Sequence, residues 1–198
     1  MKIKETFVGY TGSIDVGRYC FFIDIDQYGA EVNINDLAKQ AIHFPRIVLI
    51  GEPFEQKQEV SKLIKKIINV NLDTIIEINT NGTIRPTGIT TYNNVIFNVI
   101  LQLKNSGKQY ENRIKESVIN WFNEAVANFK FYVNNEDDVD EANLIVNNFG
   151  IKRKQVYLSI KEEATKEQLE FLIKQARLNN YNFTLDYDKL FWRNKNDR

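Results

Sequence analysis

Apolar runs typical of buried strands alternate with amphipathic segments of helical spacing about six times along this chain of 198 residues. Residues 46–50 form a short apolar run, which predicts a buried parallel strand. Residues 55–69 place Val60, Leu63 and Ile64 on one helical face. Parallel strands need crossover connections, so the alternation predicts an α/β fold with a mostly parallel sheet and helices on the outside. Either an open sheet or a partial (β/α) barrel satisfies this pattern.

The element boundaries follow from apolar runs and capping residues. We expect strands at 19–26, 46–50, 74–78, 95–101, 129–133, 155–159 and 181–185, the last at an edge. Helices are expected at 35–41, 55–69, 110–127, between Asn135 and Gly150, and from Thr165 to Asn179, with Asn35, Asn135 and the Thr165–Gln168 pair as amino-terminal caps. The chain has no repeat and no linker of low complexity, so residues 1–198 are expected to form one domain.

The composition excludes several classes of function. Lys and Arg together number 26 and so do Asp and Glu, so no global basic field favours nucleic acid. The sequence has no apolar stretch of membrane-spanning length, and the first five residues lack a signal core. The single Cys cannot form an internal disulfide, which favours a cytoplasmic protein. His43 is the only histidine, so zinc sites and nucleophilic triads have little support.

Ligands of such folds bind at the carboxyl ends of the strands. In this chain those ends are expected at residues 50–53, 79–83, 102–107 and 134–135, and three of them carry recognisable motifs. The segment Ile50-Gly51-Glu52-Pro53 resembles the Gly-Gly-Glu-Pro segment of radical S-adenosylmethionine enzymes. Residues 77–83 are similar to the Glu-Thr-Asn-Gly-Thr strand end of the same family. Residues 101–107 resemble the Ser-Pro-Lys…Ser-Gly segment of 7-carboxy-7-deazaguanine synthases.

The motifs occur in the family's order along nearly the whole chain. The resemblance implies a partial barrel of the radical S-adenosylmethionine type and, by analogy with the family, a homodimer. It also marks a set of ligand-binding candidates, which are Gly51, Glu52, Gln56, Asn79, Asn81, Lys104 and Ser106.

One part of the family pattern is missing. The family places a Cys-xxx-Cys-xx-Cys loop directly after its first strand, and its thiolates hold an iron–sulfur cluster. Here only Gln27-Tyr28-Gly29 follows Asp26 before the next helix, and the single Cys20 lies inside the strand. We expect Cys20 to be a buried apolar side chain and expect no iron–sulfur cluster. The family's Arg-Leu-His is replaced by Asp186-Tyr187-Asp188, and its first cofactor glycine by Ile50.

Each candidate also has a structural interpretation. For Glu52, a role as a turn residue is favoured over contact with a ligand. For Asn79 and Asn81 a structural role is also favoured, because Asn before Gly is an ordinary tight-turn signal. For Lys104 and Ser106, anion binding and a structural role are equally supported.

Two aspartate pairs could hold a divalent cation. Asp24 and Asp26 share one face of a strand by period two, and so do Asp186 and Asp188. If the pairs met, they could bind Mg²⁺ or Mn²⁺ and support phosphoester chemistry. Exposed strand-end carboxylates are the favoured interpretation.

The leading hypothesis is a pseudoenzyme with this fold that binds a protein partner or a small nucleotide-like ligand. A module that still recognises S-adenosylmethionine or a deazapurine is the first alternative. A repurposed carboxylate–metal enzyme is the second, and cluster ligands supplied by a partner chain are the third. No nucleic-acid or membrane partner is indicated.

Overall fold

A curved sheet of nine strands organises the protein, for which a computed structural model describes residues 1–89, 93–160 and 164–187. The strands lie in the order β3-β1-β2-β4-β5-β6-β7-β8-β9. Strand β2 and strands β4 to β9 pair in parallel with their neighbours in that series, whereas β1 pairs antiparallel with β2 and β3. The bounds are β1 Lys2–Tyr10, β2 Tyr19–Ile25, β3 Ala30–Glu31, β4 Arg46–Gly51, β5 Ile75–Thr80, β6 Val95–Leu101, β7 Asn128–Tyr132, β8 Val156–Ile160 and β9 Asn182–Leu185.

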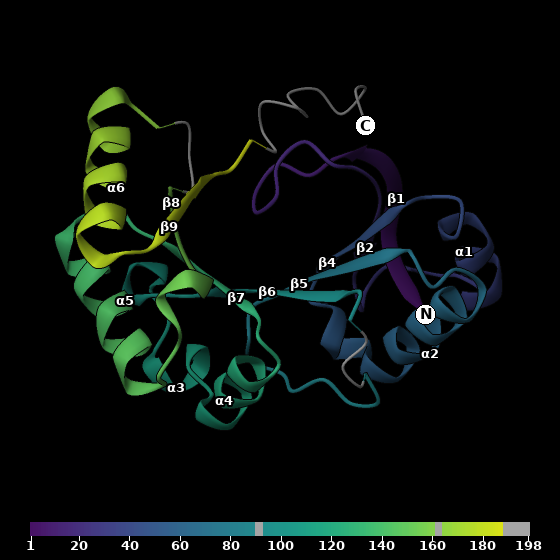
Figure 1. Cartoon of the computed structure of the whole chain (residues 1–198). Helices are drawn as coiled ribbons and strands as arrows, with labels where there is room; N and C mark the ends of the chain where they lie inside the picture. The colour runs from purple at the N-terminus through teal and green to yellow at the C-terminus, as the bar shows by residue number, and fades with distance from the viewer. Residues whose placement is uncertain (90–92, 161–163, 188–198) are drawn as a thin grey trace.

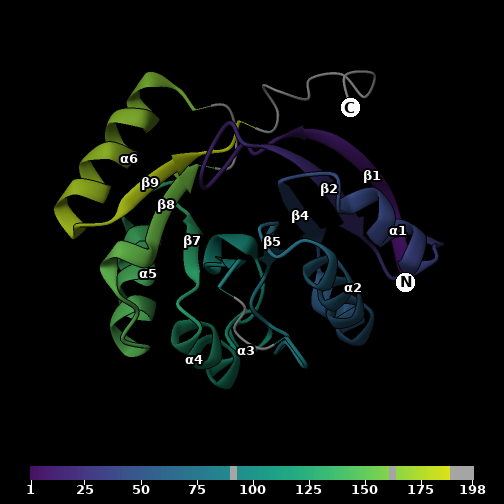
Figure 2. The ribbon, with the colours of Figure 1, turned by 45° about the vertical axis from the view of Figure 1, so that its right-hand side comes forward.

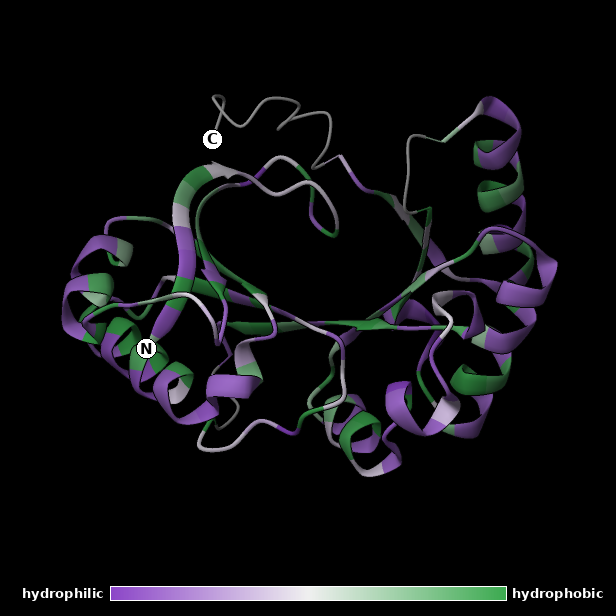
Figure 3. Cartoon of the chain, turned by 180° about the vertical axis from the view of Figure 1, so that it is seen from behind, coloured by the Kyte–Doolittle hydropathy of each residue, from purple (hydrophilic) through white to green (hydrophobic). Residues whose placement is uncertain are grey.

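The helices cover the outer, convex face of this sheet (Figure 1). They are α1 Ile34–Ala41, α2 Lys57–Val70, α3 Tyr110–Arg113, α4 Glu116–Glu124, α5 Glu136–Asn148 and α6 Lys166–Asn179, with short 3-10 turns η1 Pro53–Gln56, η2 Lys104–Ser106 and η3 Arg153–Gln155. Figure 3 shows strongly hydrophobic central strands beneath helices that also carry hydrophilic residues. The main core lies between these two layers, because Ile47, Ile78 and Phe129 on the strands pack with Leu63 and Phe122 on the helices.

The sheet forms a partial barrel whose two edges are joined by a loop rather than by strand pairing. Residues Thr11–Arg18, between β1 and β2, project over the concave side of the sheet (Figures 1 and 2). The Tyr187 N–H, just after β9, donates to the Gly12 carbonyl at 2.8 Å. This arrangement confirms the predicted mostly parallel α/β fold and places polar loop residues inside the curve.

The first helix starts earlier than predicted. Asn33, and not Asn35, is the amino-terminal cap, and its side chain accepts from the Asn35 N–H at 2.8 Å. An asparagine with extended backbone in that position satisfies one of the free donors of the first turn.

The predicted helix 110–127 is two helices. Ile114 has an extended backbone between α3 and α4, with φ −117° and ψ 111°. Its side chain is buried in the main core, so core packing interrupts the helix at this point. Other predicted signals are confirmed: Asn135 caps α5, Gly150 has a positive φ after α5, and Thr165 with Gln168 forms a capping box on α6.

Strand β1 was not predicted from the sequence. It lacks the apolar pattern of a buried strand, because only Ile3 and Gly9 of its nine residues are buried. Instead, β1 is held in the sheet by its antiparallel pairing with β2. Among the described residues, no helix combines the length and the apolar character needed to cross a membrane.

Candidate functional site on the concave face

The concave face of the sheet is polar along its middle strands. Side chains alternate between the two faces of a strand, so the residues next to core positions point inward. The inward residues of β4 to β7 include Arg46, Glu77, Asn98 and Lys130, all buried, and the partly exposed Asn79. Polar side chains in otherwise apolar strands cost free energy unless they are paired. Their pairing therefore defines the chemistry of this face.

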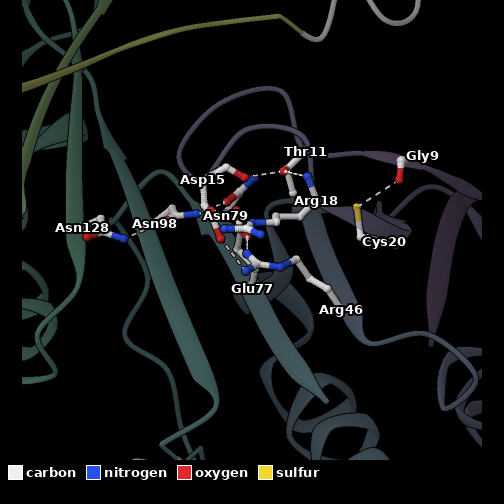
Figure 4. Close-up of polar contacts among 10 residues, drawn as sticks. All are labelled: Gly9, Thr11, Asp15, Arg18, Cys20, Arg46, Glu77, Asn79, Asn98 and Asn128. Atoms are coloured by element: carbon white, nitrogen blue, oxygen red, sulfur yellow. Dashed lines mark hydrogen bonds and ion pairs between the residues drawn. The ribbon is translucent and has the colours of Figure 1, made fainter. Parts of the chain in front are cut away.

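Three asparagines form an amide ladder across β5, β6 and β7 (Figure 4). Asn79, Asn98 and Asn128 are register partners in neighbouring strands. The Asn128 amide donates to Asn98 Oδ1 at 3.0 Å, and the Asn98 amide donates to Asn79 Oδ1 at 3.0 Å. Asn98 also donates to the Glu77 carboxylate at 2.6 Å.

The carboxylate fixes the direction of this ladder. An ionised Glu77 only accepts, so Asn98 must turn its NH₂ group toward it and its oxygen toward Asn128. The second N–H of Asn98 then meets the oxygen of Asn79. The NH₂ group of Asn79 is left at the end of the ladder, with no hydrogen-bond partner among the described residues, and Asn79 is partly exposed.

A charged group anchors the ladder from the other side. Arg46 lies between two carboxylates, with Nη1 at 2.8 Å from Glu77 and Nη2 at 2.6 Å from Asp15 in the β1–β2 loop. Burial raises the pKa of Glu77 above its ordinary value, although the hydrogen bond and charge of Arg46 act in the opposite direction.

A second charged group lies on β7. Lys130, whose side chain is 3% exposed, forms an ion pair with Asp186 and donates to Ser13 Oγ at 2.7 Å. The Tyr132 hydroxyl donates to the same Asp186 carboxylate. Asp186, predicted to stand where the family has an arginine, is therefore held by a lysine and a tyrosine.

The β1–β2–β4 side of the concave face is apolar. Cys20, Phe22 and Val48 form a small buried cluster, against which Phe7 and Ile50 pack. The Phe7 and Phe22 rings stack with centroids 4.6 Å apart. The concave face thus combines an aromatic, apolar part with a row of amides, a combination typical of small-molecule sites.

Gly51 and Glu52 both contact neighbouring strands or strand ends of the sheet. Gly51 has φ +85°, and a Cβ built on it would lie 2.1 Å from the Ile25 carbonyl oxygen. The Glu52 carboxylate accepts from the Thr80 hydroxyl at 2.7 Å and from the Asn81 N–H at 2.8 Å. These bonds tie the ends of β4 and β5 together. Burial raises the pKa of Glu52 despite the two bonds.

Two further candidates form structural hydrogen bonds, one within a turn and one to the start of β1. Asn81 Oδ1 accepts from the backbone N–H of Thr83 at 2.9 Å, a turn of the kind expected for Asn before Gly. The Gln56 side chain bonds both the N–H and the carbonyl of Lys2, each at 2.7 Å, and so holds the start of β1. Asn79 is the candidate that the structure brings to the concave face.

Lys104 and Ser106 lie elsewhere, on η2. The Lys104 N–H donates to Glu141 on α5, and Ser106 Oγ bonds the Leu103 carbonyl within the turn. Lys104 lines an open cleft of about 640 Å³ between the η2–α3 segment and α5, together with Arg113 and Asp140.

The aspartate candidates for a metal have separate partners. Asp24 lies 3.7 Å from Lys4, Asp26 accepts from the Tyr28 N–H, and Asp186 is bound as described above. Asp188, the fourth of these aspartates, lies outside the described residues. Within the described part of the chain, no group of three or more His, Cys, Asp or Glu side chains could hold a metal ion.

The residues do not fit a site-differentiated iron–sulfur cluster. Cys20 Sγ is buried and lies 3.6 Å from the Gly9 carbonyl, within the sheet (Figure 4). The turn after β2 is tight: the Gly29 N–H donates to the Asp26 carbonyl at 2.9 Å, and a Cβ on Gly29 would lie 2.1 Å from the Ile3 carbonyl oxygen. That turn carries no thiolate, so no step of radical chemistry can be assigned to these residues.

Sequence reasoning missed most of the concave-face residues. The signal was present as polar residues at every second position of apolar strands, in Glu77–Asn79 and in Asn128–Lys130–Tyr132. No local signal points to Asp15, because the loop meets Arg46 only in the folded chain.

No family model matches the sequence, and no curated protein matches it. Among solved structures, the fold is similar to the crystal structure of QueE from Escherichia coli, a 7-carboxy-7-deazaguanine synthase and radical S-adenosylmethionine enzyme. The TM-score is 0.67 and the sequence identity 16%, over 93% of this chain and 92% of the QueE chain. This chain therefore has a radical S-adenosylmethionine-like α/β fold of the QueE type.

Proposed function

We propose that this protein is a pseudoenzyme of the QueE-like fold that binds a small, planar, nucleotide-like ligand on its concave face. The amide ladder is the observation that supports it. Glu77 fixes the ladder so that the NH₂ group of Asn79, a partly exposed residue, has no hydrogen-bond partner within the described residues. A ring nitrogen or carbonyl of a ligand would accept from it.

The surroundings of Asn79 support the same class of ligand. On the neighbouring part of the concave face, Phe7 and Ile50 are partly exposed, and both pack on the buried cluster of Cys20, Phe22 and Val48. A planar heterocycle could place one face on such a surface and direct one polar edge to the amides. The contacts of Gly51 and Glu52 with the protein's own strands favour a heterocycle over the methionine end of S-adenosylmethionine.

A thermal-shift and calorimetric screen tests the proposal. The probes are 7-carboxy-7-deazaguanine, guanine and S-adenosylmethionine at millimolar concentration, because a ligand at 100 times its Kd stabilises the folded state by about 2.7 kcal/mol. We expect stabilisation by at least one purine-like probe. We also expect Asn79→Ala to weaken its affinity about tenfold, the loss of one hydrogen bond.

Asn120→Ala, on the exposed surface of α4, is the matched control and is expected to leave the affinity unchanged. Absence of stabilisation by every probe would refute a purine-like ligand. Equal affinity of wild type and Asn79→Ala would refute the assigned site.

A further inference from the structure

The loop between β1 and β2 connects the two open edges of the barrel. We call residues Thr11–Arg18 the strap. It leaves β1 at one edge of the sheet and reaches β9 at the other: Thr184 Oγ1 donates to the Ser13 carbonyl at 3.0 Å, and the Tyr187 N–H donates to the Gly12 carbonyl. The strap therefore crosses the concave face between strands that do not pair with each other (Figures 1 and 2).

The strap is held to the concave face by polar contacts. Asp15 pairs with Arg46 on β4, and Ser13 accepts from Lys130 on β7. Its shape is kept by internal bonds, since Thr11 Oγ1 donates to the Asp15 carbonyl and the Gly17 N–H donates to the Thr11 carbonyl. Asp15 and Gly17 both have a positive φ. These bonds hold the strap in one shape independently of its contacts with the sheet.

Apolar burial contributes little to its attachment. Ile14 is the one hydrophobic side chain of the strap that is buried, and Val16 is 43% exposed. Segments with few buried apolar contacts open locally at a lower free-energy cost than the core. By contrast, six residues of α2 are buried.

We infer that the strap opens independently of the barrel, hinged at β1 and β2, and that the Asp15–Arg46 ion pair latches it over the concave face. Opening removes the strap from Arg46 and Lys130 and uncovers the face that carries Asn79. That the strap acts as a gate for ligand entry rests on the proposed function. That the strap opens does not depend on the proposed function.

Hydrogen exchange of the ligand-free, full-length protein tests the opening. The reporter is the Tyr187 amide, bonded to Gly12, and the reference is the set of amides between β4 and β5. We expect the Tyr187 amide to exchange at least about 100-fold faster than the reference, because local opening is less costly than global unfolding. Asp15→Asn is expected to accelerate it about tenfold further, relative to the reference amides.

A second readout is acylation of Lys130 by an amine-reactive reagent, followed by peptide mass spectrometry, since this side chain is shielded in the closed state. Asp15→Asn should increase its labelling. Asp36→Asn on α1 makes the same charge change at an exposed ion pair and should alter neither readout. Exchange of Tyr187 at the reference rate, or identical exchange and labelling in Asp15→Asn and wild type, would overturn the inference. These outcomes are independent of the ligand screen.

Discussion

The Arg46 guanidinium on β4 lies 2.8 Å from the Glu77 carboxylate on β5, and the side chains are 8% and 6% exposed. The pair connects the two polar systems of the concave face. Glu77 directs the amide ladder through Asn98, and Arg46 holds the strap through Asp15. Charges this deeply buried are stable only with their partners, so the pair can be tested by removing one side or both.

Removal of one partner should be strongly destabilising. We expect Glu77→Leu to lower the free energy of unfolding by about 3–5 kcal/mol, because it leaves the Arg46 charge buried with only Asp15. The double variant Arg46→Met/Glu77→Leu should lose less than the sum of the two single variants. Urea unfolding of the four proteins gives the coupling free energy. Strictly additive losses would contradict a direct interaction.

Alanine substitutions at two glycines should separate the cost of a left-handed backbone from the cost of a steric clash. Gly51 and Gly107 have φ values of +85° and +73°, but only Gly51 lies against another strand, at the Ile25 carbonyl. Gly107→Ala should cost about 1 kcal/mol for its left-handed backbone. Gly51→Ala should cost at least about 2 kcal/mol more, because the β2–β4 pairing must shift to admit the methyl group. Equal losses in thermal or urea unfolding would show that the space at Gly51 is not closed by β2.

The pH dependence of stability should report Glu52. Burial raises its pKa in the folded state above the ordinary value of 4.5. The folded state therefore retains a proton that the unfolded state has released, so this group's contribution to the free energy of unfolding falls as pH rises from 4.5 through the raised pKa.

Glu52→Gln has no such proton. The unfolding free energy of wild type minus that of Glu52→Gln should decrease as pH rises over that window. Urea unfolding at a series of pH values measures it. Glu116→Gln, at the exposed start of α4, makes the same change away from Glu52 and is the control. An increase of the difference with pH would contradict the buried environment of Glu52.

The sequence predicted the fold well because periodicity reflects burial directly. The strand at 95–101 and the capping box at Thr165 were located from local pattern alone. Strand β1 was not, because its order depends on pairing with β2 rather than on its own apolar residues. Core packing at Ile114 likewise interrupted a helix whose local pattern is continuous.

The site was predicted less well, for a physical reason. Motif resemblance identified the strand ends, where Glu52, Gln56 and Asn81 bond neighbouring backbone or side chains. The inward polar residues belong to the interiors of strands, and their partners lie on other strands. Of the residues predicted as ligand contacts, only Asn79 is also one of the described inward polar residues.

We infer that this protein functions without a radical-generating cluster, and anaerobic iron–sulfide reconstitution tests this most directly. QueE from Escherichia coli, treated in parallel, is the positive control. We predict that this protein, after desalting, retains no stoichiometric iron, shows no visible iron–sulfur absorption and releases no 5′-deoxyadenosine from S-adenosylmethionine. A brown protein with stoichiometric iron that cleaves S-adenosylmethionine would contradict the claim.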